Sequence, residues 1–173
     1  MSTHPFRSLF RPALGIVALM ITIALHAAPV RAQAPETSDE GTLEYRQKLM
    51  SGVGADMGAI GDILKYGLPL QSHIVAHAQM LSQRADLVAA AFERNVSEGP
   101  TDAKPEIWAK PDEFRQKAQD MKAEADKLAE IAASGDAAAI GGQVKALGDA
   151  CGSCHDSFRK PKEESYKRAG GGS

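Results

Sequence analysis

Cys151-Gly152-Ser153-Cys154-His155, close to the C-terminus, is the stretch of sequence that decides how this chain folds. Its C-x-x-C-H spacing is the attachment signature of a c-type haem. In a helix, the two thiols lie on neighbouring turns of one face, where they can form thioether bonds to the two vinyl groups of one porphyrin. His155 projects from the same face and can ligate the iron. The stretch therefore predicts one covalent haem c, attached through Cys151 and Cys154, with His155 as the proximal iron ligand.

Other uses of two closely spaced cysteines fit less well. A thioredoxin-like dithiol needs a surrounding βαβ pattern, which the sequence lacks. A structural zinc site usually needs four protein ligands, and the chain contains only two cysteines. A disulfide between residues three positions apart in one helix is poorly placed. The adjacent histidine favours haem.

Residues 1–32 resemble a secretory signal peptide. A basic start precedes the apolar run Ala13–Leu25, and Val30-Arg31-Ala32 is a small-residue cleavage pattern that would leave Gln33 as the new N-terminus. Thirteen apolar residues are too few for an ordinary transmembrane helix, which needs about 20. An uncleaved N-terminal anchor is the alternative. We expect export to the periplasm and a mature chain without an integral membrane segment.

Cleavage would leave 141 of the 173 residues, enough for one domain with a hydrophobic core. Because residues 1–32 contain three arginines and no acidic residue, their removal changes the formal net charge from −2 to −5. An acidic chain argues against nucleic acid as a partner.

The apolar pattern of the remaining chain is helical, and no segment alternates as a strand would. Residues 33–41 are expected to be a flexible lead-in, residues 42–161 a four-helix bundle and residues 162–173 a flexible tail. The expected helices are Thr42–Tyr66, Leu70–Glu93, Pro111–Ala133 and Ala137–Lys160. Short connections, apart from one longer loop over residues 95–112, predict an all-α antiparallel bundle.

Each predicted helix has an apolar stripe that we expect to face the core. In the first helix the stripe is Met50, Val53, Met57, Ile60 and Leu64; in the third it is Phe114, Ala118, Met121, Ala125, Leu128 and Ala132. The first helix also contains four glycines, each of which costs about 1 kcal/mol relative to alanine. These glycines are Gly52, Gly54, Gly58 and Gly61. They suggest that a flat macrocycle or a packed helix approaches the backbone closely.

Three local matches make residues 41–162 resemble a class II c-type cytochrome of the cytochrome c′ family. They are Tyr45-Arg46-Gln47, Pro105-Glu106-Ile107-Trp108 and the segment from Cys151 to Arg159. The resemblance implies a covalent haem inside a left-handed four-helix bundle. It also places Met50, one turn after Tyr45-Arg46, over the distal face of the haem. Methionine at this position is similar to the low-spin branch, in which methionine and histidine ligate the iron.

Two functions follow, depending on Met50. If Met50 is the sixth ligand, the protein is a periplasmic electron carrier and not an enzyme. Ligation by methionine and histidine raises the reduction potential of the haem and occupies every coordination site of the iron. If Met50 is only a core residue, which is common for methionine, the alternative is a five-coordinate haem that binds nitric oxide or carbon monoxide. Met57 is the fallback ligand. A haem peroxidase is a weaker hypothesis, because no distal histidine and arginine pair is evident.

The resemblance also implies roles for two arginines. Arg46 would pair with a haem propionate, and Arg159 would lie beside the proximal imidazole. A solvated surface charge for Arg46 and a favourable charge at a helix C-terminus for Arg159 are the alternatives.

His73 and His77 have a metal-compatible spacing without a third ligand, so we expect them at the surface. Trp108 is expected to anchor the long loop. The expected partners are periplasmic redox proteins and a possible second copy in a homodimer.

Overall fold

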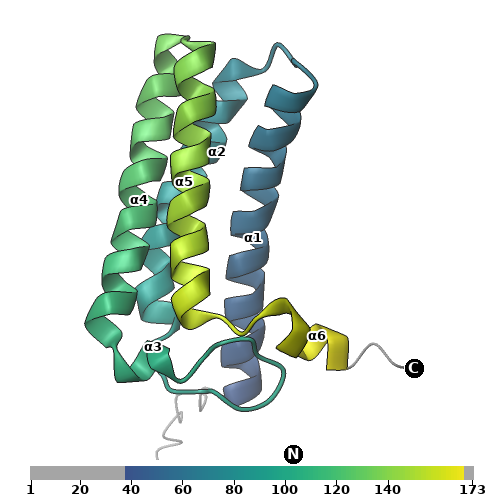
Figure 1. Cartoon of the computed structure of the whole chain (residues 1–173), viewed down its shortest axis with the longest axis vertical. Helices are drawn as coiled ribbons and strands as arrows, with labels where there is room; N and C mark the ends of the chain where they lie inside the picture. Colours follow the sequence, from purple (N-terminus) through teal and green to yellow (C-terminus); the bar gives the residue numbers. More distant parts are fainter. Residues whose placement is uncertain (1–37, 170–173) are drawn as a thin grey trace, which may run out of the picture. The chain divides into compact units, whose positions relative to one another are not determined.

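The computed structural model describes residues 38–169. The predicted signal peptide lies outside these residues, as do most of the predicted lead-in and residues 170–173. Within the described part, the elements are α1 (Asp39–Lys65), α2 (Gln71–Ala91), α3 (Glu106–Ala109), α4 (Pro111–Ser134), α5 (Ala137–Phe158), the 3-10 turn η1 (Lys162–Glu164) and α6 (Tyr166–Ala169). The four long helices form the predicted antiparallel bundle (Figure 1). No helix between residues 38 and 169 is long and apolar enough to cross a bilayer.

The turn between α4 and α5 follows its local sequence signals. Gly135 has a φ of +90°, a left-handed conformation that glycine adopts without steric cost and that ends α4. The Asp136 carboxylate then accepts hydrogen bonds from the backbone N–H groups of Ala138 and Ala139, both at 3.0 Å, and caps α5. This confirms the predicted boundary. At the other end of the chain, Ser38 caps α1, so α1 begins three residues before the predicted Thr42.

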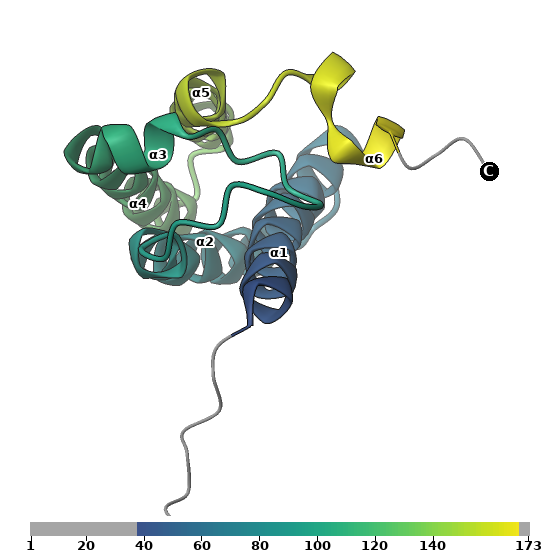
Figure 2. The same ribbon diagram turned by 90° about the horizontal axis from the view of Figure 1, so that it is seen from below.

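The main helix contacts follow the order α1–α2, α2–α4 and α4–α5. Figure 2 shows α1 and α5 on different sides of the bundle end, with the connection from α2 to α4 crossing between them. Trp108 holds this connection, because its indole N–H donates to the carbonyl of Phe92 at 2.8 Å. The predicted anchoring role of Trp108 is therefore confirmed.

The core consists of two clusters of buried side chains. One occupies the middle of the bundle, where Leu81, Leu128 and Leu147 have no more than a trace of exposed surface. The other lies toward the loop end and includes the edge-to-face rings of Phe114 and Phe158, with centroids 5.2 Å apart. Every residue of the predicted α4 stripe is buried.

The predicted stripe of α1 is partly wrong. Leu64 is 37% exposed, and Met50, Val53 and Met57 are only half-buried. The buried residues of α1 are instead Leu43, Arg46, Leu49, Asp56, Ile60 and Ile63. Of the predicted stripe only Ile60 is buried, and the buried side of α1 also contains the charged residues Arg46 and Asp56.

One α1 glycine permits close packing of a charged side chain. A Cβ at Gly52 would lie 2.3 Å from a guanidinium nitrogen of Arg84, whereas a Cβ at Gly54, Gly58 or Gly61 would meet nothing within 4 Å. Arg84 donates from Nε to Asp56 at 2.8 Å, in the interface between α1 and α2.

His77 joins the same cluster. Its Nδ1 lies 2.9 Å from the other oxygen of Asp56, a carboxylate whose side chain is 7% exposed. The expectation that His77 is a surface residue is therefore wrong, because the imidazole is half-buried against α1. Among residues 38–169, no group of three potential metal-binding side chains occurs.

Candidate functional site

A cavity of about 400 Å³ lies between the walls formed by α1 and α5. Most of its lining is apolar, with side chains from α1, α2, α4, α5 and the connection between α2 and α4. The apolar residues include Leu43, Met50, Val53, Phe92, Ile107, Phe114, Met121 and Phe158. The cavity therefore offers a flat hydrophobic group a largely apolar environment inside the bundle.

The C-x-x-C-H stretch lines this cavity from the α5 side. Cys151, Cys154 and His155 all border it, and both cysteines are free and half-buried. Burial raises the pKa of the Cys151 thiol, and burial, assisted by the Cys151 charge, raises the pKa of Cys154 to about 11. Without haem, both cysteines are thus neutral thiols at neutral pH.

His155 borders the cavity and is exposed. The surrounding protein nevertheless lowers the pKa of His155 by desolvation, and the Arg159 charge lowers it further, while Asp156 opposes both. The imidazole is therefore neutral at neutral pH, which is the state that binds iron.

Met50 lines the same cavity from α1. It is half-buried and packs against the cluster that contains Leu49 and Phe158. Met57 packs against the mid-bundle cluster and is not among the cavity-lining residues. Of the two candidate methionines, the structure brings only Met50 to the cavity that His155 also borders.

Arg46 donates hydrogen bonds to backbone carbonyls at the end of α2 and in the segment that follows it. Its side chain donates from Nε to the carbonyl of Ala91 at 2.8 Å, from one terminal nitrogen to Val96 at 3.0 Å, and from the other to Arg94. The guanidinium also stacks over the ring of Phe92, 4.6 Å from the centroid. Arg46 is 3% exposed, so it is not a solvated surface charge. Its pairing with a propionate stays a prediction.

Arg159 follows the last residue of α5 and borders the cavity. Its guanidinium lies 3.2 Å from a carboxylate oxygen of Asp102. The backbone nearby is paired as well, since Lys104 N–H donates to the Phe158 carbonyl at 3.0 Å. Arg159 thus joins the end of α5 to the loop at residues 101–104, one turn after His155.

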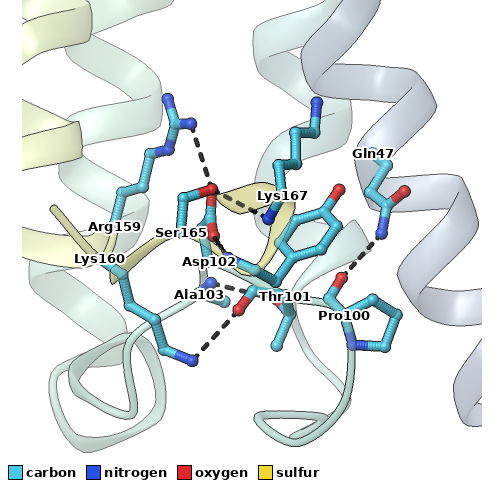
Figure 3. Close-up of polar contacts among 10 residues, drawn as sticks. Gln47, Pro100, Thr101, Asp102, Ala103, Arg159, Lys160, Ser165 and Lys167 are labelled. Atoms are coloured by element: carbon cyan, nitrogen blue, oxygen red, sulfur yellow. Dashed lines mark hydrogen bonds and ion pairs between the residues drawn. The ribbon is translucent and has the colours of Figure 1, made fainter. Parts of the chain in front are cut away.

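Sequence reasoning missed the segment after α5. It predicts a flexible tail from residue 162, but residues 162–169 form η1 and α6, and Ser165 is buried. Asp102 holds this segment, because its carboxylate accepts from the Ser165 hydroxyl and the Tyr166 N–H, both at 3.0 Å (Figure 3). Tyr166 and Lys167 thereby border the cavity. The charged, glycine-rich tail sequence contained no signal for these contacts.

The residues present fit a covalent haem. Two thiols and a neutral imidazole on one helix border a mostly apolar cavity, and these are the donors that haem c attachment and iron ligation need. In the comparisons, a sequence model described as cytochrome c′ matches residues 41–159. The chain belongs to the cytochrome c′ family. It carries one haem c, bound covalently through Cys151 and Cys154.

Individual relatives match the chain over most of their own length. A cytochrome c′ from Pararhodospirillum photometricum is 36% identical over 124 residues, covering 71% of this chain and 99% of the relative. A cytochrome c-554 from Cereibacter sphaeroides is 34% identical over 150 residues, covering 84% of this chain and 97% of the relative. A solved nitric oxide complex of a cytochrome c prime mutant from Alcaligenes xylosoxidans is 30% identical, with a TM-score of 0.64, and the match covers 72% of this chain and 98% of that one.

These comparisons confirm the family and the fold, but they do not support the predicted low-spin branch with methionine and histidine ligands. The matching proteins include one named cytochrome c′ and a cytochrome c prime solved as a nitric oxide complex.

Proposed function

We propose that this protein binds nitric oxide or carbon monoxide at its haem, with His155 as the iron ligand contributed by the protein. The observation that carries the proposal is the likeness over nearly the whole folded chain to a relative solved as a nitric oxide complex. The chemistry of the cavity agrees with it, since small uncharged gases need no charged partner and most of the lining is apolar.

When bound, the haem supplies an iron that changes between Fe(III) and Fe(II) and that binds diatomic gases in the ferrous state. The chain would supply the remaining elements. Cys151 and Cys154 fix the macrocycle, and the neutral His155 imidazole holds the iron from α5. The α1 wall, with Met50 and Val53, would border the face on which a gas binds.

A second candidate is one-electron transfer with Met50 as the sixth iron ligand. The observation that favours it is the position of Met50, which borders the cavity that His155 also borders. A thioether ligand would raise the reduction potential and leave no vacant site for a gas.

The optical spectrum of the purified ferrous protein, recorded with and without CO, separates the two functions. For a gas-binding protein we expect a broad high-spin spectrum that shifts promptly when CO is added. Sharp, well-separated α and β bands that CO barely changes would overturn gas binding and support the electron carrier.

Met50→Leu provides the matched variant, because leucine keeps the apolar volume but cannot ligate iron. If the iron site is open, the rate of CO binding should change less than threefold in this variant. If Met50 is a ligand, CO binding should accelerate by orders of magnitude. Met57→Leu, which alters a methionine away from the cavity, is the control and should leave both spectrum and rate unchanged.

The place of action is proposed to be the periplasm, on the basis of the signal-like residues 1–32. N-terminal sequencing of haem-containing protein from a periplasmic extract should begin at Gln33. A sequence that begins at residue 1 or 2 would contradict cleavage. Association with redox partner proteins and formation of a homodimer are likewise proposals, and sedimentation of the holoprotein tests the second.

A further inference from the structure

The C-terminal strap, residues 160–169, contributes Tyr166 and Lys167 to the border of the cavity. It begins where Lys160 N–H donates to the Asp102 carbonyl at 2.7 Å, and the buried Ser165 fixes it again on the Asp102 side chain. This attachment places Lys167 on the border of the cavity. The family model matches residues 41–159, so the strap lies outside the matched residues.

The charges around the cavity point to an anionic group. Four basic side chains and one carboxylate border it, although the whole chain has a formal net charge of −2. The basic residues are Arg46, Lys117, Arg159 and Lys167, and the carboxylate is that of Asp102. An excess of positive charge beside an apolar cavity suits an apolar ring that carries carboxylates.

Three of these basic side chains already have partners within the protein. Arg46 donates to backbone carbonyls, Lys117 donates to the Ser153 hydroxyl at 2.5 Å, and Arg159 pairs with Asp102. Among residues 38–169, no carboxylate lies within ion-pair distance of the Lys167 ammonium. Figure 3 shows the side chains of Arg159 and Lys167 extending to the same side of the Asp102 contacts.

We propose that Lys167 binds a propionate carboxylate of the haem and that the strap exists to hold it there. The vinyl groups of the haem are bonded to Cys151 and Cys154 on α5, and the propionates lie on the opposite edge of the macrocycle. They therefore meet residues from other elements. On α1, Arg46 is occupied by carbonyls, whereas Lys167 on the strap is available. The proposal requires only the covalent haem and holds for either function of the iron.

Lys167→Gln in the haem-loaded protein tests the proposal. Loss of a positive charge near the haem destabilises the ferrous state, so the midpoint potential should fall. The resonance Raman bending mode of the propionates should also shift downward, because one carboxylate loses a charge-assisted hydrogen bond. Lys167→Arg should keep both readouts close to those of the original protein.

Arg168→Gln is the matched control. It removes one positive charge from the neighbouring position, whose exposed side chain is not among the cavity-lining residues. Its propionate mode should be unchanged and its midpoint potential should move less than in Lys167→Gln. Equal changes in the two variants, or a propionate mode unaffected by Lys167→Gln, would overturn the proposal.

Discussion

The two sides of α1 are built from opposite chemistry. Toward α2, the helix is closely packed around a buried carboxylate, with Gly52 making room for the guanidinium of Arg84. Toward α5, the same helix borders a cavity with Met50, Val53 and Gly54. One side is therefore completed by the chain itself, and the other requires the haem. Without haem, α1 would be held mainly by its contacts with α2.

The largest effect should come from removing covalent haem attachment with Cys151→Ser and Cys154→Ser together. The cavity would lose its content, while α2, α4 and α5 keep their mutual contacts. We expect loss of most of the free energy of unfolding, which for a domain of this kind is about 5–15 kcal/mol.

Hydrogen exchange resolves this effect by helix. Amides of α1 should lose protection first, and those of α4 last. Ser153→Ala, which leaves both thiols intact, is the control and should retain the holoprotein pattern. Uniform loss of protection across all four helices would contradict the one-sided attachment of α1.

A smaller effect is expected at the packed side from Asp56→Ala. Without this carboxylate, Arg84 loses its counter-charge and His77 loses a hydrogen-bond partner, while both side chains remain partly buried. Loss of one partner of a fully buried pair costs about 3–5 kcal/mol, and because Arg84 is a third exposed we expect about 2–3 kcal/mol.

Urea unfolding of the holoprotein measures this change. Asp149→Ala is the control, because Asp149 pairs with Lys145 one turn away on the exposed face of α5. An exposed pair of this kind contributes about 0.3–0.5 kcal/mol. If the two substitutions lower the free energy of unfolding equally, the contacts of Asp56 with Arg84 and His77 do not hold α1 on α2.

The smallest effect distinguishes two glycines on α1. A Cβ at Gly58 would meet nothing within 4 Å. Gly58→Ala should therefore stabilise the protein by about 0.5–1 kcal/mol through helix propensity. Gly52→Ala gains the same propensity but displaces the Arg84 guanidinium, so it should be neutral or destabilising. Thermal unfolding of both variants gives the comparison, and equal stabilisation would show that Arg84 moves aside at no cost.

Much of the fold was readable from the sequence, because repeated apolar spacing and strong caps are local signals. The buried stripe of α4 and the Gly135-Asp136 boundary are examples. The C-x-x-C-H stretch likewise predicted the cofactor. Its two thiols, its histidine and Met50 border one cavity, although ligation by Met50 remains a prediction.

The contacts that sequence reasoning missed join charged residues far apart in the chain. Asp56 meets Arg84 and His77 only when α1 and α2 pack in one register. Arg46 donates to the carbonyl of Ala91, 45 residues away in the chain, and the sequence around Arg46 contains no signal for this contact. Apolar periodicity also assigned Met50 and Val53 to the helix-packed core, whereas they border the cavity, because apolar side chains can face a macrocycle as well as a helix.

The order of the walls along the chain has a consequence for biosynthesis. The cavity is bordered by the first long helix, the last long helix and the strap that follows it. A ribosome therefore completes both cysteines, the histidine and the strap only at the end of translation. A chain that stops early can still pair α1 with α2, but it lacks the attachment points for the cofactor. The presence of covalent haem thus shows that translation has continued past His155.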